Sequence, residues 1–455
     1  MSTTPTSRRA APRGRVTAAA AWRHLRSAPP GPSSLPGLVW TVAIAAVFFY
    51  FSNPLSMVPF FGDSLQRAIT VALVATLVTL PWVRLPRVPW GPLVVVGLMY
   101  ASLWWTISWD VTWGVTLVYV KIAVVAWLCT WSTDIRTLAN GMHLGGVVVV
   151  VASIYAYREG LPFADVPLGT EGYLAGVGTN RNILAYTLAI ALAFALSAIP
   201  ARAVGRVLWC VGVLVLGLGL FLAQSGTGFV VAAVLVALAA LLTAASRVPA
   251  HLVPRSRGVV AALGAVVLAG GVLGLPLVGL LLGRDTTTLS GRTELWSAIW
   301  RASDGQRWLG QGWGTTWPYA WVQAPPNPRL DAITAETGTV WSHGHNSLVT
   351  VLPDLGVLGL LAIGLLHVAL LVAAVLQWRS DSGSLQLMRT VLLALVALVL
   401  LGITEPLAVT PLGWTVLVML SALVVRRREP VQAEGARYLG KNETSAAPAA
   451  EQASS

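Results

Sequence analysis

Long apolar runs recur along the chain from residue 37 to residue 425. As helices, runs of this length approach the roughly 17–25 residues that cross a hydrocarbon core about 30 Å thick. A helix that is apolar on every side is stable only against lipid or protein. The pattern therefore predicts an all-α, polytopic membrane protein with about twelve transmembrane helices and one long extracytoplasmic loop. The twelve runs are 37–52, 68–83, 91–107, 111–131, 138–157, 183–200, 207–223, 228–245, 258–282, 356–377, 390–404 and 411–425.

Arginines are unevenly divided between the alternate loops that join these runs. With a cytoplasmic N-terminus, the short outer connections hold only Arg67, Arg158 and Arg181. Cytoplasmic loops of membrane proteins are enriched in Lys and Arg, so both termini are predicted to be cytoplasmic. The inner set is Arg84, Arg87, Arg136, Arg202, Arg206, Arg247, Arg255, Arg257, Arg379, Arg389 and Arg426–Arg428.

This topology divides the chain into five parts. They are a basic, disordered cytoplasmic tail at 1–36, helices one to nine at 37–283, an extracytoplasmic loop at 284–355, helices ten to twelve at 356–425, and a disordered cytoplasmic tail at 426–455. Long ordered loops are usually functional. The candidate catalytic segment is therefore 284–355.

Composition excludes a soluble protein. Hydrophobic residues make up 56% of the chain and charged residues 11%, against about 25% charged in soluble domains. The net charge is +12, and residues 1–35 contain six arginines and no acid. Because these basic residues lie beside apolar spans, we expect them to orient the protein in the membrane and to contact anionic lipid, rather than to bind nucleic acid. Cys129 and Cys210 both fall in apolar runs, which argues against a disulfide framework and against a metal site.

The long outer loop holds the candidate chemistry. Arg292, Arg301 and Arg307 suit a pyrophosphate, because a guanidinium binds phosphate oxygens bidentately. The alternative is that they snorkel to the membrane interface or pair with Glu294 and Asp304. His345 could accept a proton from a hydroxyl near neutral pH, or could simply be a hydrogen-bonding residue. The chain contains no HExxH, CxxC, GxSxG or Walker motif, so no metal is predicted.

Five motifs, in chain order, resemble a known family. They are Gly178-Thr179-Asn180-Arg181-Asn182, Gly291-Arg292-Thr293-Glu294-Leu295-Trp296, Gly310-Gln311-Gly312-Trp313-Gly314, His345-Asn346 followed after nine intervening residues by Gly356-Val357-Leu358-Gly359, and Thr404-Glu405-Pro406-Leu407. Together they resemble the signatures of the O-antigen ligases and of the related O-antigen and exopolysaccharide polymerases. Ligases of this family often carry Ser-Arg after the seventh span, where this chain has Ser225-Gly226. Arg181 is the residue that could supply the missing charge.

The resemblance implies a metal-independent membrane glycosyltransferase with no cofactor. It implies a polyprenyl-diphosphate-linked glycan as donor, and a glycan, lipid or cell-wall acceptor at the outer face of a bacterial cytoplasmic membrane. The reaction is either polymerisation of repeat units or ligation of a finished surface polysaccharide. The expected catalytic residues are His345 and Glu405, with Arg181 and Arg292 at the donor diphosphate. The supporting motif residues are Asn182, Asn346, Gly310, Gly312, Gly314, Gly356 and Gly359.

A twelve-helix transporter or flippase of lipid-linked oligosaccharide is the alternative function. Transporters place binding groups at mid-membrane, and Lys121 lies near the middle of its apolar run. The enzyme hypothesis also predicts a contrast between two histidines. On a helix, residues two apart point in different directions, so His343 is expected to point away from the donor and to matter less than His345.

Overall fold

A computed structural model describes residues 31–52, 64–80, 88–161, 172–247, 262–274, 291–318, 327–379 and 385–426. Within these ranges all regular structure is helical, which confirms the all-α class. Both predicted tails lie almost wholly outside the described residues. The helices are α2 (Leu35–Phe51), α3 (Ser64–Val78), α4 (Trp90–Ala101), α5 (Trp109–Trp131), α6 (Ile135–Arg158), α8 (Arg181–Ser197), α9 (Ala203–Ala223), α10 (Gly226–Ala245), α12 (Arg292–Ala302), α13 (Pro328–Thr337), α14 (Ser347–Arg379), α15 (Leu385–Gly402) and α16 (Pro411–Arg426), with short 3-10 turns η3 (Ser102–Trp104), η5 (Gly176–Gly178) and η7 (Leu407–Val409).

Six of these helices are long and apolar enough to cross a membrane: α5, α6, α9, α10, α14 from Ser347 to Leu376, and α15. Six shorter apolar helices coincide with the other predicted runs: α2, α3, the α4–η3 segment, α8, the segment Ala262–Gly274, and α16. The positions of the apolar helices thus agree with the hydropathy pattern. Twelve membrane crossings remain a prediction.

Helix α8 lies at the centre of the bundle. Every residue from Leu184 to Ser197 is buried, whereas α9 exposes a row of leucines and valines that includes Leu214 at 72%. Both helices are almost entirely apolar. Lipid tolerates an apolar outer face as well as protein does, so composition alone does not separate a central helix from a peripheral one.

Two glycines bring α6 close to α2. A Cβ placed on Gly141 would lie 2.6 Å from Ile44, and one placed on Gly145 would lie 2.7 Å from Phe48. Small residues four apart let membrane helices approach closely. This contact ties α2, the first described helix, to the helix that precedes the segment 172–182.

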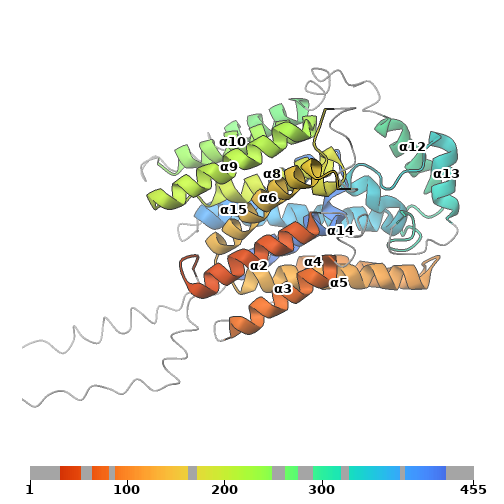
Figure 1. Ribbon diagram of the computed structural model, residues 1–455. Coiled ribbons are helices and arrows are strands. Elements are labelled where there is room, and N and C mark those ends of the chain that lie inside the picture. Colours follow the sequence, from red (N-terminus) through yellow and green to blue (C-terminus); the bar gives the residue numbers. More distant parts are fainter. Residues whose placement is uncertain are drawn as a thin grey trace, which may run out of the picture.

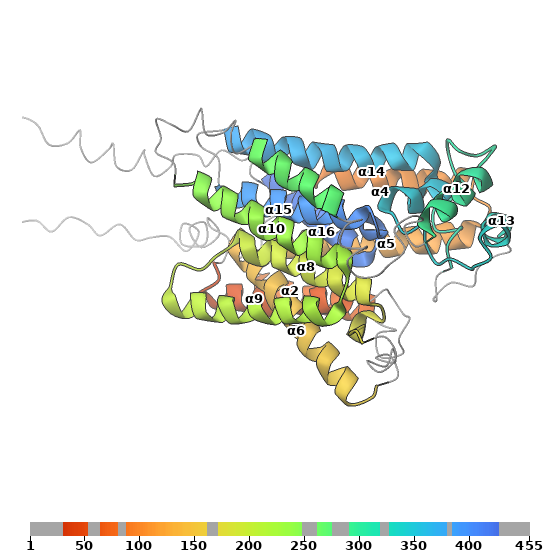
Figure 2. The same ribbon diagram turned by 90° about the horizontal axis from the view of Figure 1, so that it is seen from above.

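Helices α12 and α13 pack together at one end of the bundle, beside the first residues of α14 (Figures 1 and 2). Their apolar side chains form a cluster of their own, in which Leu295 and Ile299 of α12 and Ile333 of α13 contact Trp317 and Leu352. Leu295 and Ile299, four residues apart, thus form the buried face of α12. Trp300 lies outside that face, at 47% exposure.

Helix α14 begins nine residues earlier than the apolar run predicted, and it is broken at Gly356, where φ is 63° and ψ is −162°. The break is filled by the preceding loop. The backbone N–H groups of Val357 and Leu358 donate to the carbonyl oxygens of Arg307 and Trp308, at 2.7 and 3.2 Å. Backbone groups that leave a helix inside a protein must find other partners, and here the loop supplies them.

Candidate active site

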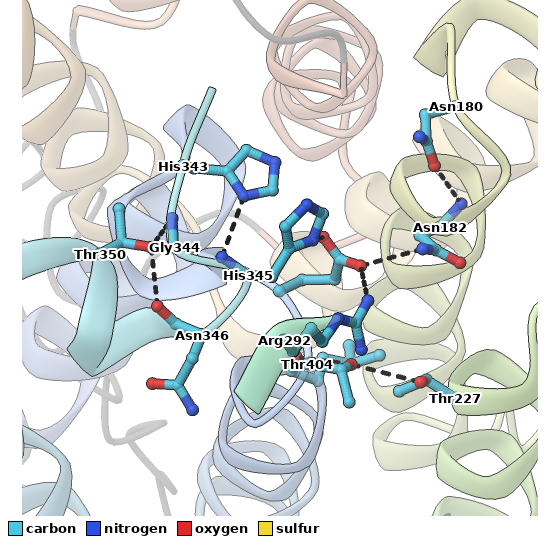
Figure 3. A network of polar contacts seen from close by, with 12 residues as sticks. Asn180, Asn182, Thr227, Arg292, His343, Gly344, His345, Asn346, Thr350 and Thr404 are labelled. Carbon is cyan, nitrogen blue, oxygen red and sulfur yellow. Dashed lines mark hydrogen bonds and ion pairs between the residues drawn. The ribbon is translucent and has the colours of Figure 1, made fainter. Parts of the chain in front are cut away.

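The side chains of Asn182, Arg292 and His345 come together from three chain segments (Figure 3). They surround a buried carboxylate, that of Glu405, on a fourth segment. Its Oε1 accepts hydrogen bonds from Asn182 Nδ2 at 2.9 Å and from Arg292 Nη2 at 3.1 Å. Its Oε2 lies 3.6 Å from His345 Nδ1. We call Asn182, Arg292, His345 and Glu405 the carboxylate cluster. The structure thus brings together three of the four predicted catalytic and donor-binding residues.

Glu405 is held in its charged form. Burial acts to raise the pKa of the Glu405 carboxyl, but the nearby His345, Arg292 and His343 outweigh it, and the net shift is downward. The Arg292 and Glu405 side chains are only 18% and 6% exposed, so solvent screens their attraction weakly. The two carboxylate oxygens therefore have different partners, since Oε1 binds the guanidinium and the Asn182 amide while Oε2 faces the imidazole.

His345 lies in a turn, with a positive φ of 47°. Its backbone N–H donates to His343 Nδ1 at 3.2 Å, and the two imidazole rings are 4.1 Å apart between centroids. The neighbouring Gly344 is fixed by Thr350 Oγ1 and by the indole of Trp296. The segment before Ser347 is not helical, so the helical geometry that was expected to separate the two histidines does not apply. That His343 points away from the donor and matters less than His345 stays a prediction.

The pKa of His343 is lowered to about 4 by burial, with the neighbouring His345 and Arg292 adding to the effect and Glu405 opposing it. A neutral His343 keeps Nδ1 available as the acceptor for the His345 N–H. Hydrogen bonding and electrostatics thus both favour the unprotonated ring, and His343 supports the turn that presents His345.

The two predicted asparagines support the site from different directions. Asn346 caps α14, since its Oδ1 accepts from the N–H groups of Leu348 and Val349, and its Nδ2 donates to the carbonyl of Ile403 at 3.1 Å. Asn182 reaches Glu405 from the first turn of α8, and its Oδ1 accepts from Ser225 Oγ at 3.1 Å. Both residues link a helix start to another segment of the site.

Three polar residues that sequence reasoning missed complete these links. Ser347 Oγ donates to the backbone carbonyl of Glu405 and accepts from the N–H of Ala408. Ser225 caps α10, and Thr227 Oγ1 accepts from Thr404 Oγ1 at 3.2 Å. Ser225 was marked only as the position of the family's Ser-Arg pair, and Ser347 and Thr227 carried no signal of their own, so only their long-range partners identify the role of all three.

The glycine motif at 310–314 docks against the broken part of α14. The N–H groups of Gln311 and Gly312 donate to the carbonyls of Pro353 and Asp354, and the Asp354 carboxylate accepts from the N–H groups of Gly314 and Thr316 at 3.1 and 2.9 Å. Gly310 and Gly356 also need to be glycine, because a Cβ at either would meet backbone atoms at 2.3 Å. The motif therefore builds the loop, and Asp354 is the unpredicted residue that anchors it.

Gly359, the last glycine of the His-Asn motif, lies three residues beyond the break in α14. A Cβ there would lie 2.4 Å from Leu355 Cβ and 2.7 Å from Val351. The side chains of the turn before the break crowd this position, so Gly359 belongs to the packing of the broken helix.

The remaining loop arginines differ in their contacts. Arg181 opens α8, next to Asn182, and its guanidinium lies 4.4 Å from the centre of the Tyr173 ring. Arg307 stacks on Trp300 and pairs with Asp304 at 3.5 Å, as the structural alternative predicted. Arg301 forms an exposed pair with Glu336. Arg292 is thus the loop arginine that joins the carboxylate cluster.

Gly226, which stands where ligases often carry arginine, is the first residue of α10. The adjacent Ser225 bonds to Asn182, a member of the carboxylate cluster. The position is thus next to the site, and Gly226 brings no charge to it. Within the described residues, Arg181 and Arg292 are the arginines on the segments that meet there.

Two histidines and the carboxylate are grouped as metal ligands would be. The ligand atoms of His343, His345 and Glu405 all lie within 4.8 Å of one another, and zinc accepts such a donor set. Arg292 opposes this use, because its guanidinium already binds Glu405 and would repel a dication. Metal independence remains a prediction.

Lys121, the residue that most favoured a transporter, is exposed on the side of α5 that points away from the other helices. The interior side of that helix carries Val115, Tyr119 and Ile122 instead. A substrate path through the bundle would need the charge on the inner side. The placement of Lys121 therefore gives no support to transport.

Comparisons with known proteins agree with the motifs. The model of the O-antigen ligase family matches residues 211–364. The exopolysaccharide production protein ExoQ of Rhizobium meliloti (strain 1021) is 26% identical over 272 residues, which cover 58% of this chain and 60% of that protein. Both findings support the O-antigen ligase-like family and, with the apolar helices, a multi-pass bacterial membrane protein. Asn182 and Glu405 lie outside the segment that the family model matches and reach the site through the fold.

Proposed function

We propose that this O-antigen ligase-like membrane protein is a glycosyltransferase of surface polysaccharide biosynthesis. It transfers a glycan from polyprenyl diphosphate to an acceptor hydroxyl at the outer face of the cytoplasmic membrane, either by extending a chain of repeat units or by ligating a finished glycan to a lipid or cell-wall acceptor. The observation that carries the proposal is the carboxylate cluster, in which a buried Glu405, His345 and Arg292 converge from separate segments.

His345 acts as the general base. With Nδ1 directed at Glu405 Oε2, its Nε2 is the nitrogen left to accept a proton. The acceptor oxygen bonds to the anomeric carbon of the donor sugar as its proton moves to Nε2, and the bond between that carbon and the phosphate oxygen breaks. Polyprenyl diphosphate departs with the electron pair. The charged carboxylate stabilises the imidazolium that forms, which is the role of the acid in other carboxylate–imidazole pairs.

Arg292 and Arg181 bind the donor diphosphate. Charge develops on the leaving diphosphate, and guanidinium groups placed beforehand stabilise it in a site from which water is largely excluded. Arg292 is held by Glu405 at 3.1 Å, and Arg181 stands at the start of α8, one residue before Asn182. Because arginines stabilise the leaving group, the reaction needs no metal ion, and a chelator should leave turnover unchanged.

The decisive experiment deletes the gene and examines both the surface glycan and the lipid-linked pool. Single or short repeats at the surface identify a polymerase, and full-length glycan retained on polyprenyl lipid identifies a ligase. A wild-type glycan in the deletion strain would refute the proposal. Lipid-linked glycan trapped at the cytoplasmic face would favour the flippase instead. Complementation with His345→Ala supplies the matched control, since it should insert normally and leave the defect uncorrected.

A further inference from the structure

An apolar groove runs between α10 and the helical segment Ala262–Gly274. Its volume is about 480 Å³, within the roughly 300–1,000 Å³ typical of small-molecule sites. Phe229, Ala233 and Ala237 line it from α10, and Gly270 and Gly274 line it from the other helix. Every lining residue is apolar and the groove is open on one side, so its occupant is hydrocarbon rather than a sugar or a phosphate.

The end of the groove at Phe229 is linked to the carboxylate cluster through Thr227 and Thr404. Thr227, in the first turn of α10, binds Thr404, the neighbour of Glu405, and Phe229 follows two residues later. From Phe229 to Ala237 the lining covers about 12 Å at 1.5 Å per residue, which is less than half of a hydrocarbon core about 30 Å thick. A chain leaving the diphosphate site can therefore enter the groove directly and run into the nearer half of the membrane.

Glycines keep the groove open. A Cβ at Gly270 would meet nothing within 4 Å, and one at Gly274 would only touch Val230 at 4.0 Å. Gly271, in contrast, packs tightly against Val234, at 2.6 Å. The two helices are thus held together at Gly271, while the positions on either side present empty space that a larger side chain would fill without striking backbone.

We propose that this groove binds the polyprenyl chain of the donor next to its diphosphate and makes the enzyme prefer long-chain donors. The inference rests on the proposed function. Binding of the polyprenyl chain requires only dispersion contacts and burial of apolar surface, and each buried methylene group adds to the affinity. An ordinary bilayer acyl chain is the competing occupant, but it would give no dependence on donor chain length.

The test uses purified enzyme and one glycan carried on two diphosphates, one with a full-length polyprenyl chain and one with two isoprene units. The variants are Gly270→Leu and Gly274→Leu. The matched control is Gly217→Leu, a helical glycine of α9 that is exposed and has nothing within 4 Å of its Cβ position. We expect KM for the long donor to rise about tenfold in both groove variants, as when roughly two methylene groups lose their contact. The kcat values, the short donor and the control should be unchanged.

Retention of wild-type chain-length preference by both groove variants would overturn the inference, as would a wild type that does not distinguish the donors. Failure of the wild type to use both the long and the short donor would instead refute the proposed function. In that case direct binding still decides the groove: polyprenyl phosphate without glycan should bind the wild type and Gly217→Leu, and Gly270→Leu should bind it about tenfold more weakly. Equal binding by all three proteins would exclude the groove.

Discussion

Replacing Glu405 by glutamine separates the charge of the carboxylate cluster from its shape. The introduced amide can keep an oxygen toward Asn182 and Arg292, which both donate to Oε1. Its NH2 group then takes the place of Oε2, which in the wild type lies 3.6 Å from His345 Nδ1. Two N–H groups repel each other, so the imidazole moves its proton to Nε2. The ring is then in the wrong tautomer to accept a proton from the acceptor hydroxyl.

The expected losses follow from these contacts. A correctly positioned base contributes about 10²–10⁴-fold to the rate, which corresponds to roughly 3–5 kcal/mol at 1.36 kcal/mol per factor of ten. Stability should fall less. A hydrogen bond to a charged group contributes about 1.5–3 kcal/mol and a neutral one about 0.5–1.5 kcal/mol. Since Arg292 keeps an oxygen partner, Glu405→Gln should cost about 1–2 kcal/mol.

Steady-state kinetics and thermal unfolding of purified protein measure the two effects. The drop should appear in kcat, with KM for the donor changed only a few-fold, because Arg292 remains in place. Glu336→Gln is the matched control: it alters another Glu–Arg pair at the same end of the bundle, but one whose side chains are 37% and 62% exposed. Exposed pairs contribute about 0–1 kcal/mol, so this variant should keep its activity and nearly all of its stability.

Two results would refute the reasoning about Glu405. Turnover by Glu405→Gln within threefold of wild type would mean that the carboxylate does not orient or stabilise the imidazole of His345. An equal loss in Glu336→Gln would mean that any disturbance of this end of the bundle reduces activity. If Glu405→Gln lowers the amount of protein in the membrane, kcat of the protein that can still be purified decides the question.

Four further changes test other parts of the site. His345→Ala should lower kcat about 10²–10⁴-fold with the donor still bound; a loss of only a few-fold in kinetics would return His345 to a hydrogen-bonding role. Arg292→Lys keeps the charge but not the bidentate fork, so donor turnover should fall markedly, and normal turnover would make Arg292 structural. Gly356→Ala should destabilise the protein by about 1–3 kcal/mol, because φ is 63° and the new Cβ would lie 2.3 Å from backbone; Gly364→Ala, with nothing within 4 Å, is the control, and equal melting temperatures would contradict the account of the break. For His343, the lowered pKa means that between about pH 6.5 and pH 4 the unfolded chain binds a proton that the folded chain does not. Its contribution to stability is therefore complete above pH 6.5 and is lost as the pH falls toward 4; the melting temperature of wild type should drop more between pH 7 and pH 5 than that of His343→Gln, and parallel curves would show that His343 is not involved.

Local sequence determined where the helices form and which residues are candidates for the active site. Apolar runs form helices because every backbone group then finds a partner within its own segment, which a membrane interior demands. Local capping adds to this: Ser225 and Asn346 bond to the N–H groups of the helices that follow them. His345, Arg292 and Glu405 could be selected because each belongs to a short sequence motif. All of these signals act over a few residues.

Tertiary structure decided how those residues meet. Asn182 and Glu405 are 223 residues apart and share a hydrogen bond, and no periodicity links two positions so distant. The proximity of His343 to His345 depends on a turn with positive φ, which is stabilised by contacts with α12 and α14 rather than by its own sequence. Gly310 and Gly356 must be glycine only because the loop docks against the broken helix, which leaves no room for a Cβ at either position. The outward placement of Lys121 was equally hidden, because a helix that lipid surrounds is apolar on both faces and the side that packs is chosen by its neighbours.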